Sequence, residues 1–160
     1  MIRSAGIIPY RKSNKTGELE FFVGHPGGPF WSEKDYWALL KGTANPDEPL
    51  LETAIREFQE ESGITLTDED KEKIWYVSSV KQRRGKMVYA YALDKPDINP
   101  SECVSNQADG CTWNEIDKFD WLPYQDIVAK THPTNVDFFV KIKDILNGKQ
   151  DREQEPHILH

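Results

Sequence analysis

Cysteine and long apolar runs are the two features that this sequence most clearly lacks. Only Cys103 and Cys111 are present, and they do not form a CxxC pair, so neither a disulfide framework nor a redox motif is indicated. No run approaches the roughly 18 apolar residues that a membrane-spanning helix needs. The apolar stretch near Met1 is also too short for a signal peptide. We therefore expect a soluble, cytoplasmic protein without a membrane partner.

Positive charge is scarce as well. The chain has 20 lysines and arginines against 27 aspartates and glutamates, which gives a net charge of −7. Acidic proteins are not generally attracted to nucleic acid backbones or anionic membranes, so a nucleic acid polymer is not expected as a partner. Any phosphate-bearing partner must instead be met by local positive charge.

The sequence does contain enough apolar volume for one domain. Hydrophobic residues make up 38% of the 160 residues, and a chain of this length fits a single core. We assign residues 1–148 to that domain and expect residues 149–160 to form a flexible polar tail. The expected assembly is a monomer or a homodimer.

Alternation and turn residues predict two β-hairpins, at residues 5–23 and 74–93, on either side of a central helix. Pro49 suits the first turn of that helix and Gly63 suits its left-handed stop, while Thr134 is a candidate N-cap for a last helix. Strands before and after one helix indicate a mixed α/β layered fold. The expected strands are residues 5–10, 19–23, 37–40, 74–80, 87–93 and 113–122, the last helix is residues 135–146, and residues 94–112 are expected to be irregular.

The central helix carries three carboxylates on one side. Glu57, Glu60 and Glu61 stand at i, i+3 and i+4, which places them within about 100° around the helix axis. Like charges roughly 4 Å apart repel by about 4 kcal/mol at an effective dielectric of 20, so a cation is expected there. Carboxylate oxygens suit Mg²⁺ or Mn²⁺. Taken alone, such a pattern is more often the solvated face of a surface helix, with Arg56 paired to nearby glutamates.

The residues around the helix form a longer pattern. From Gly42 to Ile64 the chain reads Gly, five residues, Glu, seven residues, Arg-Glu, an apolar residue, any residue, Glu-Glu, any residue, Gly and an apolar residue. Chance would produce these matches with a probability on the order of 10⁻⁹ per starting position. The pattern resembles the signature of the Nudix hydrolase family without a departure. That resemblance implies the Nudix fold, an α/β fold with a mixed β-sheet sandwiched between helices.

The resemblance also implies roles for the matching residues. The implied metal ligands are Glu57, Glu60, Glu61 and the Gly42 carbonyl oxygen. Arg56 would pair with Glu48 to brace the helix. Metal ions held there would neutralise phosphoryl oxygens and activate a water molecule for attack at phosphorus.

Outside the signature, the likeness extends over most of the chain. The stretches GHPGGPFWSEKDYWALLKG, KQRRGKMVYAYAL and NEIDKFDWL resemble a group of small bacterial proteins described as predicted Nudix NTP pyrophosphohydrolases. Members of that group usually carry proline where this chain has Leu40. The departure leaves the glutamate helix unchanged.

Basic residues near the helix are candidates for binding substrate phosphates. Lys41 directly precedes Gly42 and could reach a distal phosphate, although a solvated lysine would look the same in sequence. The second hairpin turn is strongly basic, and similar turns grip long phosphate chains in some family members, but hairpin tips are also ordinary places for solvated charge. The basic residues of this turn are Lys81, Arg83, Arg84 and Lys86. Aromatic residues available for stacking on a base are Trp31, Tyr36, Tyr89 and Tyr91, and Tyr89 is our candidate among them.

The general base lies outside the signature in many family members, just before or within a late strand. Glu115 is the first candidate here, Asp120 is the second, and Glu60 could itself orient the water. Glu115 could also be an ordinary solvent-facing charge. The four histidines show no ligand spacing and are expected at the surface.

Together these features predict a hydrolase that uses Mg²⁺ or Mn²⁺ to cleave the pyrophosphate linkage of a nucleoside diphosphate derivative. Nucleoside triphosphates and dinucleoside polyphosphates are the first candidate substrates, and nucleoside diphosphate sugars come third. The predicted catalytic residues are Glu60, Glu115 and Arg56. The alternative is a nucleotide-sensing domain that has lost catalysis, against which the intact glutamate set argues.

Overall fold

The fold is that of a computed structural model, described for residues 1–83 and 85–156. The strands are β1 (Ile2–Lys12), β2 (Leu19–Pro26), β3 (Leu40–Thr43), β4 (Trp75–Arg83), β5 (Lys86–Asp94) and β6 (Ile116–Pro123). Within the described residues they form one six-stranded sheet in the order β4-β5-β1-β2-β6, and β3 pairs with β1 beside this path.

β1 lies in the middle of the sheet and pairs with β2, β3 and β5. Residues 4–10 are buried without interruption, as expected for a strand that is covered on both faces. Ala5 lies opposite Gly42 of β3 in an antiparallel pair and opposite Tyr89 of β5 in a parallel pair. The sheet is therefore mixed, and the predicted α/β class is confirmed.

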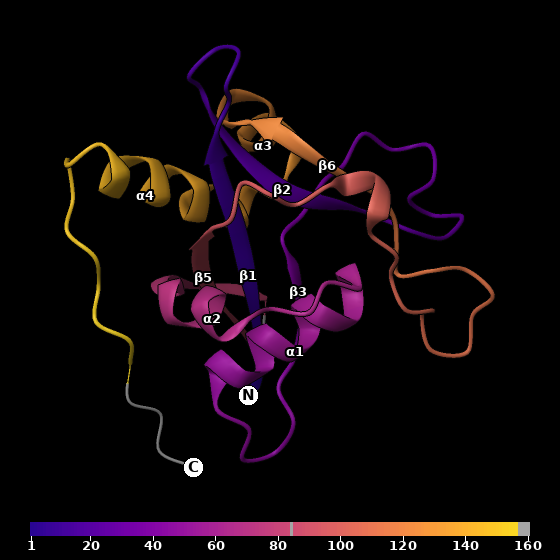
Figure 1. The fold of residues 1–160 in the computed structure, drawn as a ribbon. Helices are drawn as coiled ribbons and strands as arrows, with labels where there is room; N and C mark the ends of the chain where they lie inside the picture. The colour runs from indigo at the N-terminus through magenta and orange to yellow at the C-terminus, as the bar shows by residue number, and fades with distance from the viewer. Residues whose placement is uncertain (84, 157–160) are drawn as a thin grey trace.

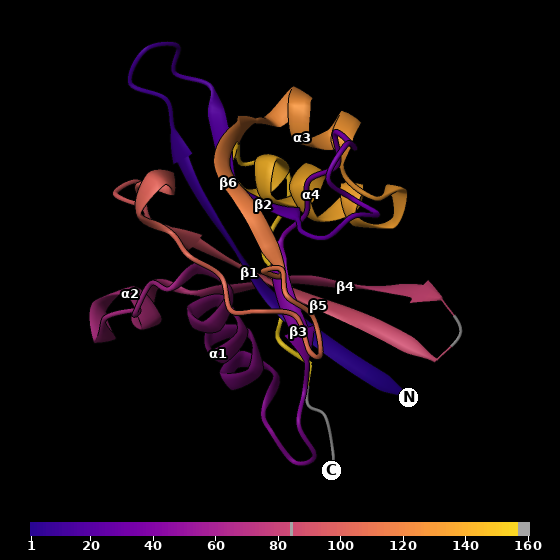
Figure 2. The same ribbon diagram turned by 90° about the vertical axis from the view of Figure 1, so that its right-hand side faces the viewer.

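Helices cover both faces of the sheet. The helices α1 (Leu50–Ser62) and α2 (Asp68–Lys73) lie on one face, and α3 (Tyr124–Lys130) and α4 (Val136–Leu146) lie on the other, as Figures 1 and 2 show. Side chains of β5 alternate between the two layers. Val88, Ala90 and Ala92 join the core on the α4 side, and Tyr91 and Leu93 join the core on the α1 side.

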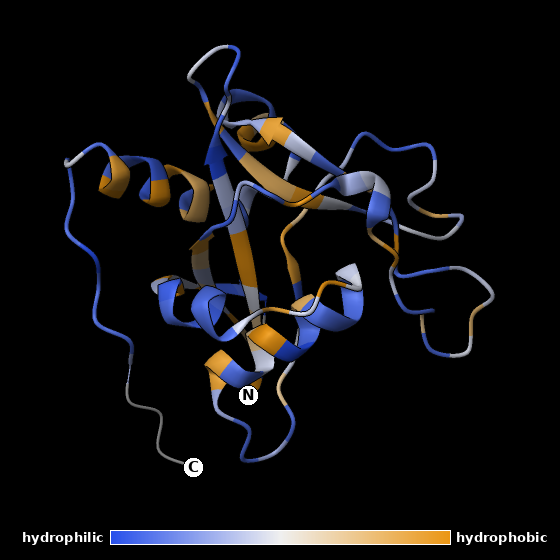
Figure 3. Ribbon diagram, in the orientation of Figure 1, coloured by the Kyte–Doolittle hydropathy of each residue, from blue (hydrophilic) through white to orange (hydrophobic). Residues whose placement is uncertain are grey.

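The helix α1 takes the predicted position between Pro49 and Gly63. Gly63 has a φ of 77°, the left-handed conformation in which glycine commonly ends a helix. Ala54 and Phe58 are fully buried against the sheet. Figure 3 shows the resulting alternation of hydrophobic and hydrophilic segments along α1, so one side of this helix packs and the other carries charge.

Both predicted hairpins are confirmed, since β1 pairs with β2 and β4 pairs with β5 in antiparallel fashion. The strand expected at residues 37–40 is wrong by three residues, because Ala38 makes only a single bridge to β2 and regular pairing with β1 begins at Leu40. The late strand starts at Ile116 rather than at residue 113. The stretch before it is irregular as expected, apart from the 3-10 turn η1 (Pro100–Glu102).

Two short helices, α2 and α3, were not predicted. A signal for α2 exists, because Thr67 and Asp70 form a reciprocal capping box at its start. The assignment of Thr134 as an N-cap is wrong. A 3-10 turn, η2 (Pro133–Asn135), precedes α4, and the His132 side chain accepts a hydrogen bond from the Thr134 amide within it.

The described part of the tail, residues 149–156, lies against the domain. The Arg152 guanidinium lies 4.4 Å from the centroid of the Trp75 ring, and the Tyr91 hydroxyl donates to Glu155 Oε1 at 2.5 Å. Flexibility of the tail stays a prediction. Among the described residues, no helix combines the length and the apolar character that crossing a membrane requires.

We expect Phe58→Ala to lower the free energy of unfolding by about 3 to 5 kcal/mol, because it removes a fully buried ring and leaves a cavity beneath α1. Urea denaturation measures the loss. The matched control is Phe30→Ala, since Phe30 is 66% exposed and should change stability by only about 0.5 kcal/mol. Equal losses in the two variants would show that α1 does not pack as described.

Candidate active site

Arg56 connects the acidic side of α1 to the segments that precede the helix. Its guanidinium makes two hydrogen bonds to Glu48, from Nε to Oε2 and from Nη2 to Oε1, both at 2.9 Å. It also donates to the Thr43 carbonyl oxygen at 3.1 Å and to Glu57 Oε1 at 2.8 Å. The Arg56 guanidinium lowers the pKa of the Glu48 carboxyl to about 2. The predicted pairing of Arg56 with Glu48 is therefore confirmed.

Gly42 of β3 lies directly against the Glu57 carboxyl group. A Cβ atom at Gly42 would be 2.0 Å from Glu57 Cδ, so a larger residue would push the helix away from the strand. Burial raises the pKa of Glu57, and Arg56 opposes that rise. The backbone of β3 and a carboxylate of α1 therefore meet at one point.

Glu61 is the most deeply buried of the three helix glutamates, with 5% of its surface exposed. Burial, the charges of Glu57 and Glu115, and a hydrogen bond with Glu115 together raise the pKa of Glu61 to about 9. Lys41 opposes this rise. At neutral pH the Glu61 carboxyl therefore holds a proton unless additional positive charge lies beside it.

Backbone hydrogen bonds hold Glu115 beside the helix. Its carbonyl oxygen accepts from the Gly27 amide at 2.8 Å, and its amide donates to the Asn106 carbonyl oxygen at 3.0 Å. The Asn106 amide in turn donates to the Glu60 carbonyl oxygen at 3.2 Å. A Cβ at Gly27 would lie 2.0 Å from the Asn114 carbonyl oxygen. Glycine is therefore needed here for the two loops to pack together.

The carboxyl groups of Glu61 and Glu115 lie at a pocket of about 670 Å³. Glu61 and Glu115 line it together with the basic side chains of Lys41, Arg83 and Lys86. Burial is the main cause that lowers the pKa of Lys41 to about 8, with the charges of Lys86 and Arg83 acting in the same direction. Other residues that line the pocket include Trp31, Tyr36, Gln82, Trp113, His132 and Asn135. Acidic and basic side chains therefore line the same pocket.

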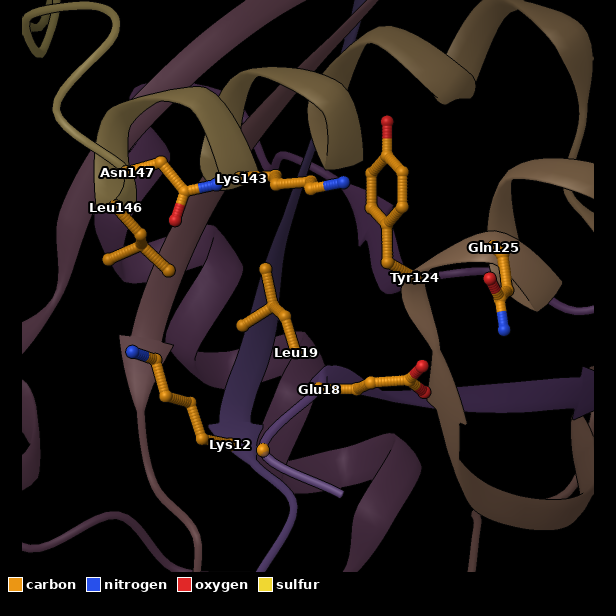
Figure 4. Close-up of a pocket in the computed structure, with 9 residues that line it drawn as sticks. Lys12, Glu18, Leu19, Tyr124, Gln125, Lys143, Leu146 and Asn147 are labelled. Carbon is orange, nitrogen blue, oxygen red and sulfur yellow. The ribbon is translucent and has the colours of Figure 1, made fainter.

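A second cavity, of about 290 Å³, lies between the β1–β2 turn and the end of α4. In Figure 4, Leu19 lies in its middle and Lys143 points toward the Tyr124 ring, whose centroid is 4.2 Å from the Lys143 Nζ atom. Glu18 is the one carboxylate among the described residues that line this cavity. It therefore lacks the clustered carboxylates of the first pocket.

Comparison with known proteins agrees with this geometry. The NUDIX domain profile matches residues 2–141. The chain belongs to the Nudix hydrolase family.

Two relatives of this Nudix protein share about a quarter of their aligned residues with it. It is 25% identical to the asymmetrical bis(5′-nucleosyl)-tetraphosphatase of Caenorhabditis elegans over 122 residues, which are 73% of this chain and 81% of that protein. It is 23% identical to the m7GpppN-mRNA hydrolase of Saccharomyces cerevisiae over 114 residues, which are 68% of this chain but only 10% of that protein. The chain thus spans about a tenth of that yeast relative.

Two solved structures share the Nudix fold. A binary complex of C. elegans Ap4A hydrolase has a TM-score of 0.65 at 22% identity, covering 92% of this chain and 99% of that one. The Nudix domain of Shewanella oneidensis NrtR, in complex with ADP ribose, has a TM-score of 0.60 at 14% identity, covering 91% and 88%. At these identities the likeness concerns the fold.

The Nudix pocket brings together some predicted substrate residues and not others. Lys41 and Lys86 line it. Lys81 does not, and Tyr89 packs against the core on the α1 side of the sheet. Arg84 lies outside the described residues. For Lys81, Arg84 and Tyr89, substrate binding stays a prediction.

The two candidate bases lie in different surroundings. Glu115 lies beside Glu61 in the pocket. Asp120 of β6 does not line that pocket, and its Oδ1 atom accepts a hydrogen bond from the Trp121 amide. The geometry therefore favours Glu115 over Asp120 as the residue nearest the clustered carboxylates.

The expectation that the histidines lie at the surface is wrong for His25. It is buried, and its ring nitrogens lie 2.7 Å from Asp117 Oδ1 and 2.6 Å from the Lys34 carbonyl oxygen. His25 thereby ties β2 to β6 and to the loop that follows β2. His157 and His160 lie outside the described residues.

The Nudix helix offers the donor atoms that a hard divalent cation prefers, which are carboxylate oxygens of Glu57, Glu60 and Glu61 and the Gly42 carbonyl. Buried Glu61, crowded by other acidic groups, fits such a cation well. Within residues 1–83 and 85–156, no three acidic, histidine or cysteine side chains are already arranged to hold an ion. Arg56 instead forms ion pairs with Glu57 and Glu60, which are two of the proposed ligands.

We expect Glu48→Gln to lower the free energy of unfolding at neutral pH by about 1 to 3 kcal/mol, because Arg56 loses its charged partner. The pKa of Glu48 is about 2 in the fold, below the ordinary 4.5. The pair therefore stabilises the fold above that ordinary value, and the stabilisation is lost as the pH falls toward the folded pKa.

Urea titrations at several pH values test this expectation. The variant should lose less stability than the wild type between about pH 5 and pH 2. Glu52→Gln is the control, because Glu52 is exposed on the same helix. An unchanged pH dependence in Glu48→Gln would contradict the assignment.

With Glu115 as the predicted general base, we expect Gly27→Ala to lower kcat for nucleotide hydrolysis by about ten- to a hundred-fold, because displacement of a catalytic group by about 1 Å has effects of this size. The added Cβ would lie 2.0 Å from the Asn114 carbonyl oxygen and would shift Glu115. Gly17→Asn is the control, since its open turn has a φ of 74° that asparagine tolerates. A wild-type kcat in Gly27→Ala would argue against a catalytic Glu115.

Proposed function

We propose that this Nudix protein hydrolyses a phosphoric anhydride linkage of a nucleoside diphosphate derivative, with Mg²⁺ or Mn²⁺ as its cofactor. The observation that carries the proposal is the meeting of paired carboxylates and basic side chains in one pocket. Glu61 and Glu115 are hydrogen-bonded there, and Lys41 and Lys86 line the same space. This arrangement suits a substrate whose phosphates lie next to the point of water attack.

The acidic side of α1 would hold the cation. The proposed ligands are Glu57, Glu60, Glu61 and the Gly42 carbonyl oxygen. A bound Mg²⁺ or Mn²⁺ supplies charge neutralisation at phosphoryl oxygens and makes water a better nucleophile. Arg56 keeps its place through Glu48 and the Thr43 carbonyl oxygen when the ligands turn away from it.

Glu115 is the general base in this proposal. When Glu61 is anionic, as a cation ligand must be, the Glu115 carboxylate is free to accept the proton that the attacking water loses. Lys41 and Lys86 bind phosphate oxygens and stabilise the negative charge that develops on the leaving group. The mechanism thus separates proton transfer, at the carboxylates, from charge stabilisation, at the lysines.

Nucleoside triphosphates and dinucleoside polyphosphates are the substrates that we propose first. Several basic side chains in one pocket favour a long phosphate chain over a single phosphate. The C. elegans relative is a bis(5′-nucleosyl)-tetraphosphatase by name, which supports the same choice. Nucleoside diphosphate sugars, with only two phosphates, come third.

A substrate panel with Mg²⁺ or Mn²⁺ tests the proposal. We expect turnover of ATP, GTP or diadenosine tetraphosphate, and we expect Glu61→Gln to lower kcat/KM by about a hundred-fold or more, because it weakens cation binding and charge neutralisation. Glu52→Gln, an exposed position on the same helix, should retain activity. Equal activity in Glu61→Gln would refute the ligand assignment. Nucleotide binding without turnover by the wild type would identify a sensing domain instead.

A further inference from the structure

The Nudix pocket is lined by acidic, basic and neutral side chains. Its lining includes the carboxyl groups of Glu61 and Glu115 and the ammonium groups of Lys41 and Lys86. From Lys86, the β4–β5 hairpin leads to Gln82, which also lines the pocket. This part of the wall therefore changes from acidic to basic and ends at a neutral amide.

Beyond Gln82 the wall consists of an amide pair and aromatic rings. Gln82 Nε2 donates to Asn135 Oδ1 at 3.0 Å. Asn135 belongs to η2, and the Tyr36 hydroxyl is hydrogen-bonded to the backbone of His132 just before that turn. Tyr36 stacks on Trp31, with ring centroids 4.6 Å apart and an interplanar angle of 26°. We call Gln82, Asn135, Tyr36, Trp31 and Trp113 the neutral sector of the pocket.

The amide pair leaves hydrogen-bonding groups for a ligand. The bond between the two side chains uses Gln82 Nε2 and Asn135 Oδ1, so Gln82 Oε1 and Asn135 Nδ2 remain. Within the described part of the chain, neither remaining atom is hydrogen-bonded to another protein group. Asn135 is only 1% exposed, and its side chain lines the pocket. An adjacent acceptor and donor is the pattern that pairs with the polar edge of a nucleobase.

Trp113 supplies an accessible flat surface in the same sector. It lines the pocket, and 40% of its surface is exposed. Aromatic side chains that remain accessible in this way provide stacking surfaces for nucleic acid bases. Trp113 also stands only two residues before Glu115, so a base packed on it would lie close to the carboxylates.

We propose that the neutral sector is the nucleobase subsite of this pocket. Gln82 Oε1 and Asn135 Nδ2 hydrogen-bond to the edge of the base, and Trp113 packs on its face. The phosphates lie beside Lys41 and Lys86, and the cleaved linkage lies near Glu61 and Glu115. The proposal rests on the function proposed above, because it names how that substrate is recognised.

The first test is Gln82→Ala, which removes one hydrogen bond to the base and leaves the charged residues in place. We expect KM for ATP to rise about three- to ten-fold, the usual worth of one such bond, with kcat unchanged. The Ki of inorganic tripolyphosphate, a competitor without a base, should not change. Gln125→Ala is the matched control, because Gln125 belongs to the remote cavity of Figure 4. An unchanged KM for ATP in Gln82→Ala would overturn the proposal.

The second test is Trp113→Leu, which removes the stacking surface. We expect KM for ATP to rise about five-fold or more, since stacking of one base on an aromatic ring contributes on this scale. The Ki of tripolyphosphate should again stay constant. A parallel rise in the tripolyphosphate Ki would overturn the proposal, because it would mean that the phosphate region, not a base subsite, had been disturbed.

Failure of the proposed function would look different from failure of the subsite. If the wild type hydrolyses no nucleotide, the proposed function fails, and tryptophan fluorescence can still measure the Kd of ATP and of tripolyphosphate. Tighter binding of ATP than of tripolyphosphate, with the difference reduced in Gln82→Ala, would support the base subsite. Equal Kd values for the two ligands in the wild type would overturn it.

Discussion

The repulsion between like charges on one side of α1 is the constraint on which the rest of the site depends. Glu57 and Glu61 belong to the same helix, and Glu115 adds a third carboxyl group from a separate loop. Arg56 offsets part of this repulsion through its bonds to Glu48 and Glu57. The offset is incomplete, because the pKa of Glu61 is still raised to about 9. The fold therefore keeps a place where a further positive charge is stabilising.

Close backbone packing creates this crowded arrangement. The Glu57 carboxyl lies against Gly42, where any side chain would collide with it, and the Gly27 loop packs equally closely on Asn114. These approaches bring β3, α1 and the segment before β6 to one point. His25 adds a buried connection between β2, β6 and the loop that carries Trp31. The positions of the proposed catalytic groups thus depend on contacts between loops as much as on the helix.

Several features of the fold could be predicted because their signals are local. Pro49 and Gly63 mark the ends of α1, and alternation of apolar residues marks both hairpins. The helices α2 and α3 were not predicted, because they are only six and seven residues long. A helical repeat of apolar residues cannot be recognised over so short a stretch. The position of β3 could not be predicted from local signals, because Leu40 pairs with Ile7 of β1, which lies 33 residues earlier in the chain.

The sequence by itself determined that Glu57, Glu60 and Glu61 share one side of a helix braced by Arg56, because their spacing is set within a single helix. Only the tertiary structure decided which other groups join them. Neighbouring residues of a strand point to opposite faces, so Lys86 lines the pocket while Tyr89 packs on the α1 side. Glu115 beside Glu61, and Gln82 bonded to Asn135, are contacts across 53 or more residues. No local pattern encodes such contacts, because they arise only when the separate elements pack together.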